Sequence, residues 1–152
     1  MKVLFMCTAN SCRSILSEAV FNHLAPAGWR AVSAGSFPSG QVHPLSLKTL
    51  EQLGIASEGL SSKGSEVFAE AVPDIVITVC DKAAGEPCPV YFGPALKAHW
   101  GLEDPSHVAG DEAAVMAAFR ATVTQIERRC RALLALSPAE IDAAHLQRIG
   151  QL

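Results

Sequence analysis

The hydrophobic positions near the N-terminus change from the spacing of a strand to that of a helix. Residues 2–6 hold a run of large apolar side chains, which is typical of a short buried strand. From residue 15 the apolar residues recur at helical spacing, up to a stop signal at Pro26 and Gly28. A short polar loop joins the two segments. The pattern therefore predicts a strand, a loop and an amphipathic helix in direct succession.

Strand and helix patterns continue to alternate along the rest of the chain. We expect further strands at residues 30–36, 74–79 and 96–100, and helices at residues 44–53, at residues 61–71 and in a long segment opened by Asp111. The strand at 74–79 is the clearest, because its β-branched residues are continuous. Ser137 and Glu140 have the spacing of a capping box, which predicts a short terminal helix. The alternation indicates an α/β fold with a parallel sheet.

Length and composition describe an ordinary globular protein. The chain has 152 residues, of which 49% are hydrophobic and 18% charged, and we expect residues 1–152 to form a single domain. The net charge of −3 gives no support for nucleic-acid binding. No apolar run reaches the length of a membrane span or of a signal peptide, so we expect a cytoplasmic protein. In that compartment the five cysteines favour catalytic, redox or metal chemistry over a structural disulfide framework.

The densest basic group is formed by Arg128, Arg129 and Arg131, late in the long predicted helix. Basic side chains in a last turn complement the helix dipole. We therefore expect these three arginines to be solvated rather than to form a binding patch.

The loop after the first strand carries the most specific chemical signal. Backbone amides of such a loop and the N-terminus of the next helix converge on one point and form an anion cradle. Cys7 opens this loop and Arg13 closes it. Positive potential favours a thiolate at Cys7, and the planar Arg13 guanidinium can hold two oxygens of a tetrahedral oxyanion. Ser14 could donate to the thiolate or satisfy backbone groups. The alternative is a buried cysteine beside a surface arginine.

The loop sequence Cys-Thr-Ala-Asn-Ser-Cys-Arg-Ser, at residues 7–14, resembles the low-molecular-weight protein tyrosine phosphatase superfamily, and most closely its arsenate reductase branch of the thioredoxin-coupled type. The resemblance extends to about Leu136 and leaves the terminal helix, residues 137–152, uncovered. It implies a three-layer α/β fold with a four-stranded parallel sheet flanked by helices. It also implies that the oxyanion is bound by Thr8, Ala9, Asn10, Ser11, Cys12, Arg13 and Ser14.

Asp104 is the candidate general acid. Thiolate attack on phosphorus or arsenic needs a protonated leaving oxygen, and a loop carboxylic acid can supply the proton. Asp104 and Pro105 could instead form an ordinary turn. The superfamily carries its acid in a late Asp-Pro loop, so the resemblance favours Asp104 over the neighbouring Glu103. Phosphatases typically have tyrosines just after this pair, whereas this chain has Ser106 and His107.

Cys80 and Cys88 lie in the predicted loop after strand 74–79. They could be incidental thiols or metal ligands, although the histidines nearby are not at a tight metal-ligand spacing. A thiol relay is a sharper hypothesis, because a thiolate attacks a sulfur that carries a good leaving group. Cys80 would attack Cys7, and Cys88 would then attack Cys80. This pair most separates the reductases from the phosphatases.

The resemblance implies an enzyme of arsenic detoxification with no bound cofactor and no metal. Cys7 would attack arsenate, Asp104 would protonate the departing oxygen, and the relay would release arsenite and leave a Cys80–Cys88 disulfide. Thioredoxin would reduce that disulfide. The Cys80–Cys88 spacing is one residue longer than in the best-known thioredoxin-linked members, so glutaredoxin with glutathione remains an alternative donor. We expect a monomer that binds neither nucleic acid nor membrane.

Two alternative functions remain open. A low-molecular-weight phosphatase would hydrolyse phosphotyrosine through a phosphocysteine at Cys7, and would need neither Cys80 nor Cys88. A non-catalytic thiol protein would bind zinc or arsenite through its cysteines.

The resemblance also implies a polar shell that supports the loop. Asn10 would shape the cradle, surrounded by Glu18, Ser33 and Ser61. Some relatives bind potassium there with an acidic residue near position 63, where this chain has Lys63. Its ammonium could replace the ion, so we predict no potassium dependence. Cys12 could serve packing or act as an oxidation trap for Cys7, and Cys130 lies on the apolar stripe of the long helix.

Overall fold

Four parallel strands form the sheet in this computed structural model, which describes residues 1–64, 73–80 and 95–152. The strands are β1 (Lys2–Cys7), β2 (Arg30–Gly35), β3 (Ile75–Thr78) and β4 (Leu96–His99), and they lie side by side in the order β2-β1-β3-β4. The chain passes from β2 across β1 to β3, so β1 ends where the strand order reverses. Ligands of open α/β sheets bind at such a point, outside the carboxyl ends of the strands.

Alternate residues of β1 and β3 point to opposite faces of the sheet, and both faces are buried. Val3, Phe5 and Ile77 belong to the main core, whereas Leu4 and Met6 belong to a second cluster on the other face. All five side chains are at most 2% exposed. Burial on both faces explains why these strands are continuous apolar runs rather than alternating ones.

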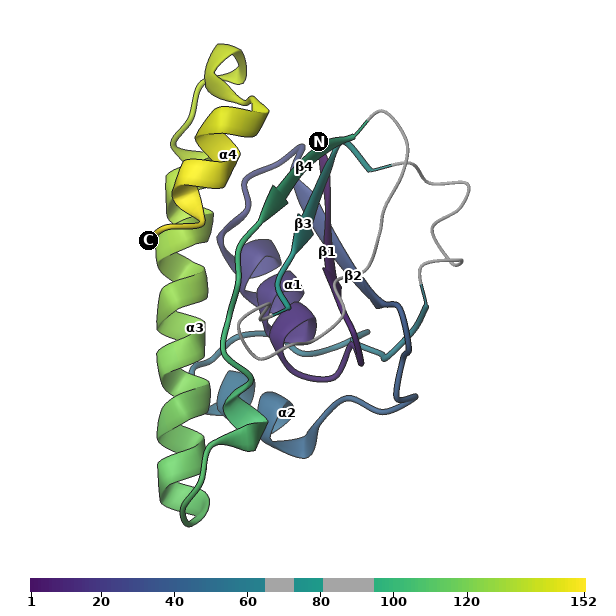
Figure 1. The fold of residues 1–152 in the computed structure, drawn as a ribbon, viewed down its shortest axis with the longest axis vertical. Coiled ribbons are helices and arrows are strands. Elements are labelled where there is room, and N and C mark those ends of the chain that lie inside the picture. Colours follow the sequence, from purple (N-terminus) through teal and green to yellow (C-terminus); the bar gives the residue numbers. More distant parts are fainter. Residues whose placement is uncertain (65–72, 81–94) are drawn as a thin grey trace.

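The described helices are α1 (Arg13–Leu24), α2 (Pro44–Gln52), α3 (Glu112–Leu134) and α4 (Ala143–Ile149), with single 3₁₀ turns at η3 (Pro105–His107) and η4 (Pro138–Glu140). α1 and α3 pack together against the sheet, α2 lies against α3, and α4 packs on α3 and β4 (Figure 1). α3 begins after Asp111, whose side chain accepts a hydrogen bond from the Ala114 amide. The predicted four-stranded parallel sheet with flanking helices is confirmed.

Three expectations need correction. Residues 61–64 do not begin a helix, because Lys63 uses its backbone N–H and carbonyl to bind the Asn10 side chain and the Gly35 amide. The remaining part of the predicted helix, residues 65–71, lies outside the described residues. The capping box at Ser137 forms as predicted but opens only the turn η4, and α4 starts later, with Asp142 as its cap. Arg129 is not solvated: it is 4% exposed.

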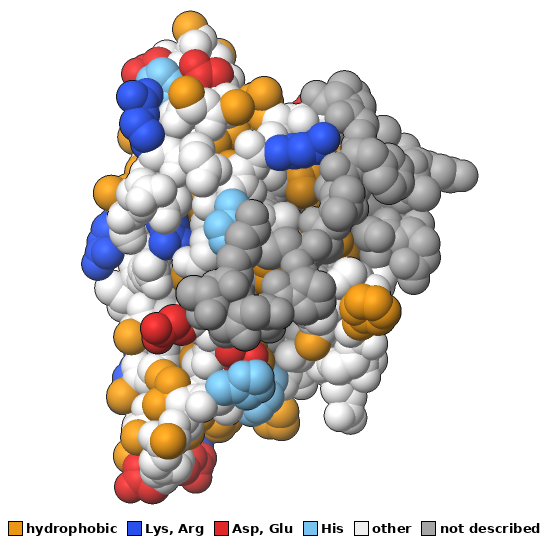
Figure 2. Space-filling view, viewed as in Figure 1, with side chains coloured by type: hydrophobic (Ala, Val, Ile, Leu, Met, Phe, Trp, Pro, Cys, Tyr) orange, Lys and Arg blue, Asp and Glu red, His pale blue; other side chains and the backbone are white. Residues whose placement is uncertain are grey.

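The surface seen in Figure 2 carries basic and acidic side chains of the described residues in separate small groups rather than in one field. None of the helices in residues 1–64, 73–80 and 95–152 has the length and apolar character needed to cross a bilayer. The carboxyl ends of the strands all point to the edge of the sheet where η3 and the start of α2 lie (Figure 1). The candidate site is built on that edge.

Candidate active site

Cys7 is the last residue of β1 and is 2% exposed. The loop that follows it is held by its carbonyl oxygens. Three of these carbonyls accept from backbone amides of the segment after β2: Cys7 from Ser36 at 3.1 Å, Thr8 from Phe37 at 2.9 Å and Ala9 from Ser39 at 3.0 Å. The Ser11 carbonyl accepts from the His43 amide at 3.1 Å and from the Ser46 hydroxyl at 3.0 Å. These bonds turn the carbonyls away from the loop centre, which is the polarity that an anion cradle requires.

Gly35, at the end of β2, allows the loop to lie this close to the sheet. A Cβ atom on Gly35 would lie 2.4 Å from the Thr8 carbonyl oxygen and 3.0 Å from Asn10 Cβ, so a side chain there would push the loop out of place. Asn10 itself adopts a left-handed conformation with φ of 50°. Asparagine tolerates this conformation better than most residues.

α1 begins directly after the loop, at Arg13. Among the described residues, no side chain caps its N-terminus, and its first turn holds no acidic residue. The amides and the dipole of this helix end are therefore directed at the loop rather than neutralised by a side chain. Residues 7–14 thus run without a break from the end of β1 through the loop into the first turn of α1, the arrangement on which the predicted cradle depends.

Arg13 joins this loop to a second loop, residues 101–104, that follows β4. The Arg13 side chain is nearly fully buried, and its Nη1 donates to the Leu102 carbonyl at 3.3 Å. Its Nη2 lies 3.6 Å from Oδ2 of Asp104. The sequence separates these residues widely, and the fold brings the guanidinium and the candidate acid into contact.

Asp104 is oriented by the residues that follow it. Its Oδ1 accepts from the Ser106 amide at 2.9 Å and from the Ser106 hydroxyl at 2.6 Å, which leaves Oδ2 directed toward Arg13. His107 Nε2 also lies 3.6 Å from Oδ2. Glu103, the weaker candidate, is exposed and lines a separate cavity against α3. Geometry therefore favours Asp104 as the acid.

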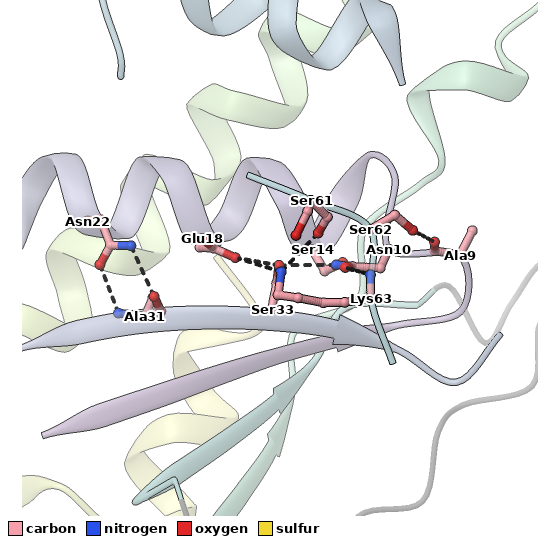
Figure 3. A network of polar contacts seen from close by, with 10 residues as sticks. All are labelled: Ala9, Asn10, Ser14, Glu18, Asn22, Ala31, Ser33, Ser61, Ser62 and Lys63. Atoms are coloured by element: carbon pink, nitrogen blue, oxygen red, sulfur yellow. Dashed lines mark hydrogen bonds and ion pairs between the residues drawn. The ribbon is translucent and has the colours of Figure 1, made fainter. Parts of the chain in front are cut away.

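The predicted polar shell forms a continuous network behind the loop (Figure 3). The Asn10 side-chain amide donates to Ser14 Oγ at 2.7 Å and to Ser33 Oγ at 3.1 Å, and Ser33 Oγ donates to Glu18 Oε1 at 2.5 Å. Lys63 contacts both ends of this network, Asn10 and Glu18.

Lys63 binds this network in two ways. Its amide donates to Asn10 Oδ1 at 2.9 Å, and its Nζ lies 3.7 Å from Glu18 Oε1 and donates to the Ser61 carbonyl at 2.9 Å (Figure 3). The ammonium is thus in contact with a carboxylate and a carbonyl, which are oxygen ligands of the kind that a potassium ion would use. Ser61 takes part through its backbone.

Cys80 lies on the same edge of the sheet as Cys7. Val79, the preceding residue, donates from its amide to the Met6 carbonyl at 2.9 Å and accepts from the Leu102 amide at 3.2 Å. Cys80 is therefore next to both the end of β1 and the acid loop. Its side chain is buried and its sulfur is in a disulfide, whereas Cys7, Cys12 and Cys130 are free thiols. Cys88 lies outside the described residues.

The remaining cysteines are less suited to act as nucleophiles. Burial raises the pKa of the Cys12 thiol, against a weaker opposing effect of the hydrogen bond from Ser11. Burial also raises the pKa of Cys130 to about 12. Both groups are therefore more firmly protonated than an exposed thiol. Among the residues described, no group of three or more His, Cys, Asp or Glu side chains gathers as a metal site.

The sequence interpretation missed three residues that bear on the site. Ser46 and Ser62 each donate a side-chain hydroxyl to a loop carbonyl, Ser62 to Ala9 at 3.0 Å. Such single hydroxyls have no periodic signature. Arg129 had a detectable signal, because it follows Ile126 by three residues and precedes Leu133 by four, on the buried stripe of α3.

Residues 2–148 match the family described as low molecular weight phosphotyrosine protein phosphatase. Over 134 residues the chain is 32% identical to the glutaredoxin arsenate reductase of Synechocystis sp., an alignment that covers 88% of this chain and 96% of that protein. The structure of an arsenate reductase from Archaeoglobus fulgidus aligns with a TM-score of 0.73 at 27% identity, over 88% of this chain and 99% of that one. A thioredoxin-dependent arsenate reductase from Corynebacterium glutamicum aligns with a TM-score of 0.64 at 30% identity, over 87% of this chain and 59% of that one.

Proposed function

The chain belongs to the low molecular weight phosphotyrosine protein phosphatase family, and we propose that within this family it is an arsenate reductase. The observation that carries the proposal is the position of Cys80, at the carboxyl end of β3 and beside the strand that ends in Cys7. Hydrolysis of a phosphate ester needs one thiolate, whereas reduction of arsenate needs a second thiol within reach of the first. The relatives named arsenate reductases support the same conclusion.

The first step is attack of the Cys7 thiolate on arsenic. Arsenate is bound by the amides of residues 8–14 and by the Arg13 guanidinium, which stabilise its negative charge. A sulfur–arsenic bond forms and one arsenic–oxygen bond breaks. Asp104 gives its proton to the departing oxygen, which leaves as water. The contact between Arg13 and Asp104 brings the acid to the mouth of the loop that holds the oxyanion.

The second step transfers two electrons to arsenic. The Cys80 thiolate attacks the Cys7 sulfur, so a sulfur–sulfur bond forms, and the electron pair of the sulfur–arsenic bond leaves with arsenic. Arsenic(V) thereby becomes arsenite, which is released. Cys88 then attacks Cys80, and this exchange frees the Cys7 thiolate and leaves a Cys80–Cys88 disulfide. A disulfide at Cys80 together with a free Cys7 is the state in which this sequence of steps would end.

The cycle closes when an external dithiol reduces the disulfide, and no bound cofactor is needed. We propose thioredoxin as this donor, with glutaredoxin as the alternative. The relatives in the two comparisons include one named for each donor. We further propose that the protein acts in the cytoplasm as a monomer.

Phosphotyrosine hydrolysis is the second candidate function, favoured by the family to which the chain belongs. It would use Cys7, Arg13 and Asp104, and Cys80 would have no role in the reaction. The residues that follow Asp104 and Pro105 argue against it, because Ser106 binds the Asp104 carboxylate and His107 is exposed where phosphatases typically carry tyrosines.

The test is an assay of arsenite formation by the purified protein, with the thioredoxin system and the glutaredoxin system supplied separately. We expect arsenate-dependent turnover with at least one donor and none for Cys7→Ser. Release of phosphate from an aryl phosphate, with no arsenite formed under either donor, would replace the proposal by the phosphatase alternative.

A further inference from the structure

Arg129 of α3 is a buried guanidinium that binds two separate backbone segments. It is 4% exposed, and it donates from Nη1 to the Gly101 carbonyl at 3.1 Å and from Nη2 to the Gly150 carbonyl at 3.0 Å. Its Nε has no hydrogen-bond partner within the described residues. Burial of a charge is costly unless it is well bound. Arg129 therefore depends on these two carbonyls, one at the start of the acid loop and the other at the end of α4.

The base of the acid loop is consequently held by two arginines from different helices. Arg129 binds the carbonyl of Gly101, and Arg13 binds the carbonyl of the next residue, Leu102. Asp104 follows two residues later and contacts Arg13. Any shift of the Gly101 carbonyl would therefore be passed to Asp104 through a short piece of backbone.

Packing holds part of this loop against α3, because Leu102 and Pro105 are buried and η3 lies against the helix. A surface pocket of about 590 Å³ lies beside this contact, lined on the loop side by Leu102, Glu103 and Pro105 and on the helix side by residues that include Gln125. Arg129 is one helical turn beyond Gln125 and spans from α3 to the loop. The hydrogen bond from Arg129 adds to this packing a directional constraint on the Gly101 carbonyl.

The C-terminal segment provides a rigid partner for the second carbonyl. Leu146 and Ile149 of α4 are buried, and the Leu146 carbonyl accepts from the Trp100 indole at 2.8 Å. A Cβ atom on Gly150 would lie 2.6 Å from the His99 carbonyl oxygen, so the chain end lies directly against the end of β4. α4 also covers an edge strand, whose His99 amide donates to the Gln147 side chain at 3.1 Å.

We propose that Arg129 is a positioning residue for the general acid Asp104, and that α4 with Gly150 is the anchor from which it acts. This inference rests on the proposed function, because it assigns a role within that reaction. Arg129 does not touch the substrate. It fixes the backbone from which Asp104 reaches the departing oxygen, and the C-terminal helix thereby becomes part of the catalytic apparatus.

The test compares Arg129→Met with Arg128→Met, which removes the same charge from the exposed neighbouring position. Arsenite formation by the full chain is measured for both, for Asp104→Asn, and for the double variant with Asp104→Asn and Arg129→Met. We expect Arg129→Met to lower kcat by about 10- to 100-fold, with KM for arsenate changed by less than about twofold, since small misplacements of a catalytic group carry costs of this order. In the Asp104→Asn background, the same change should have no further effect on kcat.

A purely structural Arg129 predicts a different pattern. It would lower kcat by the same factor with and without Asp104, or would change kcat no more than Arg128→Met does, and either result overturns the inference. Should Arg129→Met fail to fold, Arg129→Lys takes its place, because a lysine keeps the charge but cannot bridge both carbonyls with a planar fork. The expected pattern and the overturning results are the same.

Failure of the proposed function gives a distinct outcome. In that case the wild-type protein forms no arsenite, and the same variants are compared in the hydrolysis of phenyl phosphate, where Asp104 would protonate the departing phenolate. If Arg129→Met lowers kcat for this hydrolysis only when Asp104 is present, the inference about Arg129 is supported although the proposed function has failed. If Arg129→Met lowers kcat equally with and without Asp104, or if the wild-type protein hydrolyses no phenyl phosphate, the inference is overturned together with the proposed function.

Discussion

The guanidinium of Arg13 lies 3.6 Å from the carboxylate of Asp104, although Arg13 begins α1 and Asp104 lies in the loop after β4. In the proposed reaction, Arg13 binds the oxyanion and Asp104 protonates its leaving oxygen. Because the two side chains are in contact, the position of each affects the other, and both depend on how the loop after β4 is held.

Replacement of Asp104 by Asn should lower kcat for arsenate reduction on the order of 10²- to 10⁴-fold, the usual contribution of a general acid. The amide can still accept from the Ser106 amide, so the loop should keep its shape. Steady-state kinetics measure the effect, and Glu103→Gln is the matched control at the neighbouring exposed carboxylate. An equal loss in both variants would exclude a specific role for Asp104.

Replacement of Cys80 by Ser should abolish multiple turnover with arsenate while leaving the first attack by Cys7 intact. The serine hydroxyl cannot form the disulfide with Cys7 on which arsenite release depends. Arsenite is counted per protein molecule over time, with Cys130→Ala as the control for loss of a buried cysteine. Sustained turnover by the Cys80 variant would eliminate the relay.

Wild-type activity should be the same in potassium and sodium chloride at equal ionic strength. The Lys63 ammonium already contacts the Glu18 carboxylate, at 3.7 Å. Lys63→Met should lower the free energy of unfolding by about 1–3 kcal/mol, because it leaves a largely buried carboxylate without its cation. Denaturant unfolding measures that change. A clear rise of wild-type activity with potassium over sodium would show that Lys63 does not take the place of the ion.

Cys130 should resist alkylation in the folded protein and react only after unfolding. Burial holds its pKa at about 12, well above the ordinary thiol value of about 8.5. Between these values the unfolded chain loses the proton and the folded chain keeps it, so this residue lowers stability as pH rises above about 8.5. Between neutral and alkaline pH, the free energy of unfolding should fall less for Cys130→Ala than for the wild-type protein. An identical slope in wild type and variant would contradict the assignment.

The sequence predicts much of the fold because local patterns decide it. β1, the loop and α1 are contiguous, and β3 is a continuous β-branched run that is suited to a sheet buried on both faces. The segment at residues 61–64 escapes this reasoning. Its backbone hydrogen bonds go to Asn10 and Gly35, partners that are distant in the sequence.

The candidate site divides in the same way. Cys7 and Arg13 can be found from one short motif, and Asp104 from the resemblance. The contact of Asp104 with Arg13 and the role of Ser106 appear only in three dimensions. Arg129 was expected to be solvated because it lies among arginines near a helix end, yet helical spacing puts it on the buried face. Its two carbonyl partners come from segments that no local pattern connects.

We propose above all that Cys7, Cys80 and Cys88 pass electrons to arsenate held in the Arg13 loop. The most direct test of this relay is mass spectrometry of the fully reduced protein after one equivalent of arsenate, together with quantification of arsenite. We expect about one arsenite per protein molecule, a Cys80–Cys88 disulfide and a free Cys7. Unchanged arsenate with all five cysteines still reduced would contradict it.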